Sequence, residues 1–214
     1  MNKLIVFIKK DIHIIIFSLM AGFLITLALS AGAYAKRVSS EISDSVVRFH
    51  VLANSDEEFD QNLKLKVRDD ILEHIGGGLK QCKSREDAEK YLEEHLEEIK
   101  KTAEKTIKAA GYCYSVKAEL SYEHYPLRYY DNAVFPEGDY ESLRVIIGRG
   151  EGHNWWCVMY PPLCLNGGSV EYADTELLKE ILTEDGYDVV VLSSEGNVPE
   201  IKFKIVEWWT SMHD

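Results

Sequence analysis

The sequence predicts an α+β fold: an N-terminal signal or transmembrane helix, then one compact domain of antiparallel or mixed sheet packed with about three to four helices. Three observations lead to this prediction. Residues 12–35 form a long apolar run without charges. After this run, segments with apolar residues at every second position are interspersed with segments where they recur every three or four positions. The 214 residues, 46% hydrophobic and 28% charged, exclude a disordered chain or a low-complexity fibre.

The apolar run predicts export from the cytoplasm. A helix of its length rises roughly 36 Å, which is enough to cross the hydrocarbon core of a bilayer. Ala33 and Ala35 have the small-x-small spacing of a signal-peptidase site, with cleavage expected after Ala35. Because the run is longer than an ordinary signal peptide requires, an uncleaved membrane anchor remains open. We therefore divide the chain into a signal peptide or anchor, residues 1–35, and an exported domain, residues 36–214.

The exported domain is acidic. The whole chain has a formal net charge of -12, and residues 36–214 hold 21 basic and 35 acidic side chains, a net of -14. Nucleic-acid recognition depends on clustered Lys and Arg, so this balance excludes nucleic acid as the partner. It also disfavours an anionic lipid surface, and we expect membrane contact only through the N-terminal segment.

Two helices are expected to follow a first strand at residues 46–52, which are mostly apolar and rich in β-branched side chains. Ser55 and Glu58 have the spacing of a capping box, which predicts that a helix begins there. Its apolar residues recur at intervals of four, at Phe59, Leu63, Val67, Ile71 and Ile75. Three glycines at 76–78 are expected to end it.

A second capping box, Ser84 with Asp87, predicts a longer helix through about Ala110, ended by Gly111. One face of this helix is rich in Glu and Lys and is most simply a solvated face, although a partner-binding role remains open.

The remaining sequence predicts strands and one short helix. Strict alternation over residues 112–122 predicts a half-buried strand, and residues 123–140 are expected to be a loop because they contain two prolines and a glycine. Strands at 142–147 and 155–160 flank the glycine-rich residues 148–152, which predicts a β-hairpin. Residues 174–182 fit a short helix.

The C-terminal pattern has two interpretations. Pro199 suits a first helical turn, and helical spacing continues to Met212. Ile201, Phe203 and Ile205 also alternate with lysines, so a final strand competes with the helix.

Cys157 and Cys164 predict a disulfide, because the chain is exported and the two prolines between them could bend it so that the sulfurs meet. The alternative is a pair of buried free thiols. Cys82 and Cys113 flank the long helix at opposite ends, so a bridge between them is less obvious and their redox state stays open.

No catalytic, metal or cofactor site is predicted. His153 lies four positions before Cys157, but nearness in sequence is weak support for a Cys-His pair. The histidines lack zinc-ligand spacing. Gly148, Gly150 and Gly152 do not have the spacing of a dinucleotide-binding or phosphate-binding loop.

Aromatic residues are the candidates for binding a protein partner. Seven of the twelve tyrosines lie between positions 112 and 140, which is compatible with both strands and an interface. We expect one residue of the tryptophan pair to face the core and the other to face outward or to be covered. The candidate contacts are Trp155, Trp156, Tyr160, Tyr129 and Tyr130.

Three segments carry a resemblance to a known family. Residues 143–164 contain the string Asn-Trp-Trp-Cys-x3-Pro-Pro-x-Cys, and residues 48–56 and 61–69 provide a second signature near the start of the exported domain. Together with the export segment, they closely resemble the stage II sporulation protein R family of endospore-forming Firmicutes.

The resemblance implies a signalling protein made in the forespore and exported into the space between the forespore and mother-cell membranes. There it would activate the membrane-bound sigma-E processing peptidase, an aspartic protease, so that the sigma-E precursor is matured in the mother cell. It implies no catalytic residue, cofactor or small-molecule substrate in this chain. Two other functions stay open, an exported cell-wall hydrolase or peptidase and a purely structural envelope protein.

Overall fold

The structure is a computed structural model that describes residues 2–130, 132–165 and 174–192. The chain divides into two compact units, and the second unit spans Ser39–Pro199. The C-terminal segment 199–212, expected to be a helix or a strand, lies outside the described residues. The elements in chain order are α1 (Asn2–Ser43), β1 (Val47–Leu52), α2 (Glu58–Leu79), α3 (Arg85–Ala109), β2 (Val116–Tyr125), β3 (Arg128–Tyr130), β4 (Ala133–Phe135), β5 (Gly138–Ile147), β6 (Asn154–Tyr160), the 3-10 helix η1 (Leu163–Leu165), α4 (Thr175–Ile181), α5 (Glu184–Tyr187) and the π-helix η2 (Asp188–Leu192).

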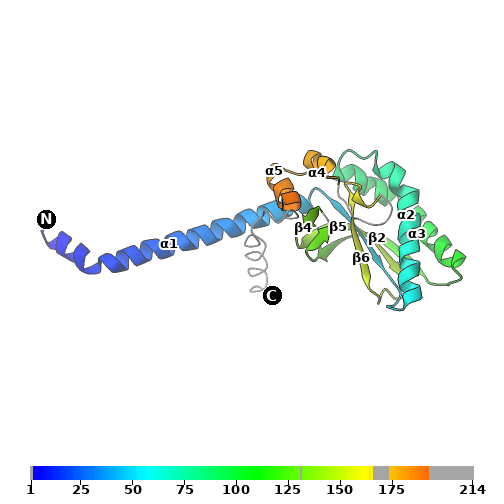
Figure 1. The fold of residues 1–214 in the computed structure, drawn as a ribbon, viewed down its shortest axis with the longest axis horizontal. Coiled ribbons are helices and arrows are strands. Elements are labelled where there is room, and N and C mark those ends of the chain that lie inside the picture. The colour runs from blue at the N-terminus through cyan, green and yellow to red at the C-terminus, as the bar shows by residue number, and fades with distance from the viewer. Residues whose placement is uncertain (1, 131, 166–173, 193–214) are drawn as a thin grey trace. The chain divides into compact units, whose positions relative to one another are not determined.

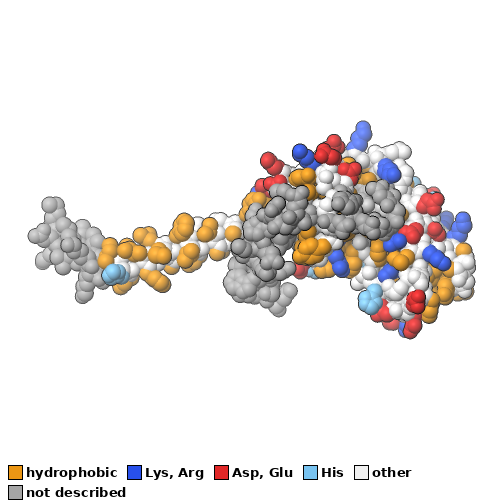
Figure 2. Space-filling model, viewed as in Figure 1, with side chains coloured by type: hydrophobic (Ala, Val, Ile, Leu, Met, Phe, Trp, Pro, Cys, Tyr) orange, Lys and Arg blue, Asp and Glu red, His pale blue; other side chains and the backbone are white. Residues whose placement is uncertain are grey.

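Helix α1 is the apolar element of the first unit. Its part from Ile12 onward includes a stretch with a mean hydropathy of 2.4 that is 0% buried, so it is long and apolar enough to cross a membrane. Figure 2 shows hydrophobic side chains along its described length. The hydroxyl of Thr26 donates to the carbonyl oxygen of Gly22 at 2.8 Å, so this polar group is satisfied inside the helix. These features fit a signal or a membrane anchor.

The second unit is built on a four-stranded mixed sheet, which confirms the predicted α+β class. The strand order is β2-β5-β1-β6. Strand β1 lies at the centre, parallel to β5 and antiparallel to β6, and all six of its residues are buried. The predicted hairpin between residues 142–147 and 155–160 is therefore wrong, because β1 is inserted between the two strands. Alternation of apolar and polar residues predicts that a segment is a strand, but it does not show which other strand lies beside it in the sheet.

The glycine-rich loop between β5 and β6 crosses the end of β1, and its glycines make this possible. The backbone of Gly148 and Gly150 has positive φ, +60° and +65°. Gly152 donates its backbone N–H to the oxygen of Ala53 at 3.0 Å. A Cβ atom at Gly152 would lie 2.1 Å from the backbone oxygen of Ser55, so no side chain fits there.

Helices α2 and α3 lie side by side on one face of the sheet (Figure 1). Their buried residues meet the inward-facing residues of the strands in the main core. The predicted apolar stripe of α2 is buried from Leu63 onward, at Leu63, Val67, Ile71 and Ile75. Phe59 is the exception, because it is 45% exposed and stacks its ring on that of Tyr112 at a centroid distance of 5.9 Å.

The predicted ends of α2 are wrong and those of α3 are confirmed. Helix α2 begins after Glu57 without a side-chain cap, and Ser55 donates instead to Asp60. It continues through the three glycines to Leu79, and a Cβ atom at Gly78 would lie 2.2 Å from the ring of Tyr91. The glycine lets the end of the Tyr91 side chain pack close to the helix and does not end the helix. In α3, the predicted cap forms as Ser84 accepts from the backbone N–H of Asp87.

The predicted loop at 123–140 is wrong, because it contains the short strands β3 and β4, the end of β2 and the start of β5. The predicted strand at 112–122 also begins too early, since β2 starts at Val116. Strands β2 and β5 pair as far as Tyr125 and Gly138, and β3 and β4 pair beyond them. Pairing is interrupted between the two ladders, where Pro126 separates β2 from β3 and Pro136 separates β4 from β5. Proline interrupts it because it has no backbone N–H to donate to the ladder.

The described part of the chain ends in short helices. Helix α4 confirms the predicted helix at 174–182, and Asp174 caps it by accepting from the backbone N–H of Leu177. The π-helix η2 follows α5 and contacts β4. Helices α2 to α5 thus complete the second unit, in agreement with the expected three to four helices.

We expect Gly152→Ala to destabilise the fold by about 2–4 kcal/mol, because the new methyl group must displace the backbone of the β1–α2 connection. The matched control is Gly77→Ala. Nothing lies within 4 Å of a Cβ atom at Gly77, so alanine there should stabilise α2 by up to about 1 kcal/mol. Urea unfolding followed by circular dichroism measures both changes, and equal stability of the two variants would contradict this role of Gly152.

Candidate functional site

The face of the sheet opposite α2 and α3, here called the second face, contains a buried arginine from β1. Arg48 is 0% exposed. Its guanidinium carbon lies 4.5 Å from the ring centroid of Tyr125, 5.1 Å from that of Tyr140 and 5.3 Å from that of Phe135. Its Nη2 donates to the hydroxyl of Tyr130 at 3.2 Å. The cation is thus held mainly by aromatic rings.

Two of the guanidinium nitrogens of Arg48, Nε and Nη1, have no hydrogen-bond partner. Among the described residues no carboxylate is paired with this side chain, and the three cation–π contacts offset part of its lost hydration. An arginine in this setting depends on all its neighbouring rings at once. It therefore ties β2, β4 and β5 to the central strand.

His50, the next residue of β1 on the second face, is the centre of a polar cluster. Its Nδ1 lies 3.1 Å from a carboxylate oxygen of Glu123, and its Nε2 lies 2.9 Å from the side-chain oxygen of Asn154. Burial would raise the pKa of Glu123, but contacts with His50 and Arg144 outweigh it and hold that pKa below its ordinary value. The ring of Trp156 stacks on the imidazole at 3.8 Å and an interplanar angle of 15°.

The tryptophan pair divides between the two faces of the sheet, as strand alternation predicts. Trp155 packs against the main core, with its ring 5.7 Å from that of Phe49 and the guanidinium of Arg68 4.8 Å away. Trp156 lies on the second face between His50 and Arg128, whose guanidinium is 5.3 Å from its ring. Both tryptophans are half-buried.

The three candidate tyrosines differ in their availability to a partner. Tyr160 is only 3% exposed, so its side chain belongs to the core and is not free for a partner, which corrects the expectation from sequence. Tyr130 is half-buried against Arg48 and Phe135. Tyr129 is 73% exposed, more than any other large hydrophobic side chain described in the second unit.

A network of hydrogen bonds joins the end of β1 to the glycine-rich loop. Asn54 accepts from the backbone N–H of Arg149 at 3.1 Å and donates to a carboxylate oxygen of Asp60 at 2.8 Å. Ser55 donates to the same oxygen at 2.6 Å. Burial would raise the pKa of Asp60, but hydrogen bonds from Ser55, Asn54 and Tyr114 outweigh it and keep that pKa below its ordinary value.

Lys64 of α2 extends this network to the start of β6. The lysine is 4% exposed, and burial lowers the pKa of its amine. Its Nζ donates to Gln61 at 2.6 Å and to the backbone oxygen of His153 at 2.8 Å. The backbone N–H of His153 donates to Asp56 at 2.6 Å. The two signature regions, residues 48–69 and 143–164, therefore meet at one end of the sheet.

Cys157 and Cys164 form a disulfide with a Cα–Cα distance of 6.2 Å. Both residues are buried, and a sulfur in a disulfide is not a nucleophilic thiolate. Cys82 and Cys113 are free thiols; Cys82 is half-buried, and burial raises its pKa, whereas Cys113 is exposed.

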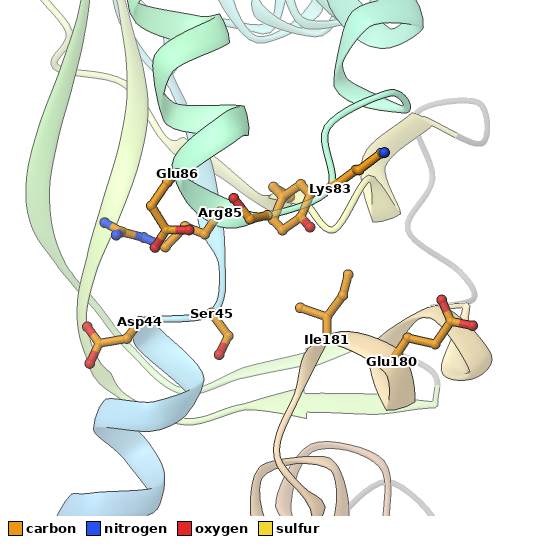
Figure 3. A pocket seen from close by; sticks show the side chains of 9 residues that line it. Asp44, Ser45, Lys83, Arg85, Glu86, Glu180 and Ile181 are labelled. Carbon is orange, nitrogen blue, oxygen red and sulfur yellow. The ribbon is translucent and has the colours of Figure 1, made fainter.

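One cavity of about 260 Å³ lies between the start of α3 and helix α4, close to the C-terminal end of α1 (Figure 3). Its lining mixes both signs of charge, with the cations Lys83 and Arg85 and the acids Asp44, Glu86 and Glu180. The hydroxyl of Ser45 donates to the backbone oxygen of Glu41 at 2.7 Å. The described residues of this cavity contain no nucleophile paired with a base.

Metal ligands are not brought together in the part of the chain that the structure describes. No group of three or more His, Cys, Asp or Glu side chains there could hold a metal ion.

Comparison with known proteins identifies relatives of this chain. The family model described as stage II sporulation protein R (spore_II_R) matches residues 43–169, which include β1, the hydrogen-bond network, the tryptophan pair and the disulfide. A Bacillus subtilis (strain 168) protein named stage II sporulation protein R is 33% identical, over 92% of this chain and 95% of that protein. No solved structure matches.

Asp60 is expected to make stability depend on pH. Because its pKa is lower in the folded chain than in the unfolded chain, its ionised form stabilises the fold above about pH 4, and this contribution is lost as the pH falls through the folded-state pKa. Asp60→Asn should reduce stability by about 1–2 kcal/mol at neutral pH and much less in acid. Ser55→Ala removes one of the donors to Asp60, so its stability should lie between that of the unmodified chain and that of Asp60→Asn. Urea unfolding from pH 7 to acid tests this; a loss independent of pH would contradict it.

Proposed function

The chain belongs to the stage II sporulation protein R family, and we propose that it is an exported signalling protein that activates the membrane-bound sigma-E processing peptidase. Family membership supports a role in sporulation. In the proposed role the protein is made in the forespore and acts in the space between the forespore and mother-cell membranes. Activation of the peptidase there couples forespore gene expression to maturation of sigma-E in the mother cell.

Two features found together support this proposal most strongly: an exposed apolar helix, and an acidic domain with an internal disulfide. The helix fits a signal or anchor, and a disulfide fits a compartment outside the cytoplasm. Either cleavage after Ala35 or retention as an anchor leaves the following domain outside the cytoplasmic membrane. The family's role in sporulation then favours the space between the two cells.

We propose that the domain acts by binding and not by catalysis. The described cavity lacks a nucleophile with its base, and Cys157 is bonded to Cys164. A protein ligand can activate a receptor when it binds the active state more tightly than the inactive one. The aromatic residues that remain candidates for this contact are Trp155, Trp156, Tyr129 and Tyr130.

Reconstitution in a host that does not sporulate tests the proposal. The full chain, the peptidase and the sigma-E precursor are produced together, and cleavage of the precursor is followed by immunoblot. We expect cleavage only when the chain and the peptidase are both present. Cleavage that is equally fast without the chain, or absent with it, would contradict the proposed activation.

The disulfide provides a second prediction that separates this function from a cysteine hydrolase. Cys157→Ser should lower the stability of the domain by about 2–3 kcal/mol, because a short loop is no longer closed in the unfolded chain. Activation of the peptidase should persist below the melting temperature of the variant. Cys164→Ser is the matched control and should behave alike, whereas loss of activation in the Cys157 variant alone would indicate a nucleophile.

A further inference from the structure

The strands β3 and β4 form a short hairpin, here called the tip hairpin and defined by residues 128–130 and 133–135. It continues the β2–β5 ladder beyond the break at the two prolines. Because of this break, the tip hairpin forms a separate two-stranded sheet. Its side chains on one side, which include Tyr130 and Phe135, contact Arg48 on the second face.

Several contacts hold the tip hairpin in place. Arg48 donates to Tyr130, and the ring of Phe135 lies beside the same guanidinium. At the base, the buried hydroxyl of Tyr140 donates to the backbone oxygen of Pro136 at 2.7 Å. All three residues of β4 are buried. These contacts hold the hairpin on the second face, and Arg48 is its polar contact with the central strand.

This arrangement presents one large side chain to solvent. Neighbouring residues of a strand point to opposite sides, so Tyr129 points away from the side that Tyr130 occupies. Tyr129 pairs across the hairpin with Val134. Val134 is 2% exposed, whereas Tyr129 is 73% exposed. A tyrosine has only two side-chain torsions to fix on binding, and an exposed tyrosine is a common interface anchor.

We propose that the tip hairpin is the docking element for the peptidase, with Tyr129 as its anchor and Arg48 as the positioning residue. This inference rests on the proposed function. The contact on the peptidase would be an apolar pocket with cationic side chains at its rim. Within the hairpin only Tyr129 is a strongly exposed large apolar group, which fits insertion of one side chain into a pocket.

The charges at the base of the hairpin favour a protein over other occupants. Asp139 is exposed and Glu137 is half-buried there, and each lies 3.0 Å from a ring nitrogen of His124, whose pKa the two acids raise. Arg128 of the hairpin has its guanidinium over the ring of Trp156, so the acids leave the base of the hairpin net acidic even with His124 protonated or neutral beside them. This charge complements a cationic rim, and together with the acidic domain it opposes an anionic lipid surface. A second copy of this chain would bring the same acids together, so self-association through this surface is disfavoured.

Binding of the full chain to the detergent-solubilised peptidase, measured as a dissociation constant, tests the inference. We expect Tyr129→Ala to weaken binding by about tenfold or more, with a matching loss of precursor cleavage. Tyr122→Ala is the matched control. Tyr122 is also a strongly exposed tyrosine, at 60%, but alternation along β2 places it on the side of the sheet that faces the helices. Its replacement should change binding by less than about twofold.

The positioning role of Arg48 is tested by a mild change in its hydrogen-bond partner Tyr130, because replacing the buried Arg48 itself would also disturb folding. Tyr130→Phe removes the hydroxyl that accepts from Arg48 and keeps the ring. We expect faster amide hydrogen exchange in residues 133–135, weaker binding by a few-fold, and unchanged exchange in β1. Unchanged exchange and binding would overturn the positioning role.

The outcomes separate the inference from the proposed function. If the unmodified chain fails to bind and activate the peptidase, the proposed function is wrong and the inference falls with it. If the unmodified chain binds and Tyr129→Ala binds equally well, only the inference is overturned. A Tyr129 effect confined to phosphatidylglycerol vesicles, or to the oligomeric state of the chain alone, would assign the surface to lipid or to a second copy and would also overturn it.

Discussion

Two polar side chains inside the central strand constrain the rest of the second unit. Arg48 and His50 alternate with the apolar residues of β1, so they lie on the face of the sheet that the long helices do not cover. A buried cation or imidazole requires partners, since burial without them costs several kcal/mol. The tip hairpin brings rings to Arg48, whereas β2 and β6 bring Glu123 and Trp156 to His50. The second face is thus an ordered polar and aromatic layer.

The residues that carry the family resemblance mostly build this scaffold. Asn54 and Lys64 hold the glycine-rich loop against the end of β1, and Trp155 packs on the main core. A motif that is specific in sequence can therefore be structural in role. The exposed Tyr129 lies outside these signature segments, on a hairpin whose position depends on Arg48 within one of them. On this account, the scaffold residues act on the partner through the surface they position.

Local patterns in the sequence predicted most of the elements, and the errors have physical causes. Ser84 capped its helix as expected by accepting from the backbone N–H of Asp87. Ser55 instead accepts from the backbone N–H of Glu57, just before the helix, and donates to Asp60, so its helix is left without a side-chain cap. The hairpin expected around residues 148–152 failed because insertion of β1 is a long-range pairing that spacing does not reveal. The signal for the second face was present: Arg48 and His50 alternate with valines and phenylalanine in the first strand. This alternation indicates that one face of the strand is polar, but it does not show which aromatic side chains cover that face.

The central claim is that this protein activates by binding, and a titration tests it most directly. Precursor cleavage is measured at a fixed amount of peptidase while the amount of the full chain is varied. A binding activator predicts a cleavage rate that rises with the amount of complex, reaches a plateau when the peptidase is saturated, and returns to the basal rate when the chain is removed. Full activation by amounts of chain far below that of the peptidase, persisting after its removal, would show that the chain acts as an enzyme and would contradict the account.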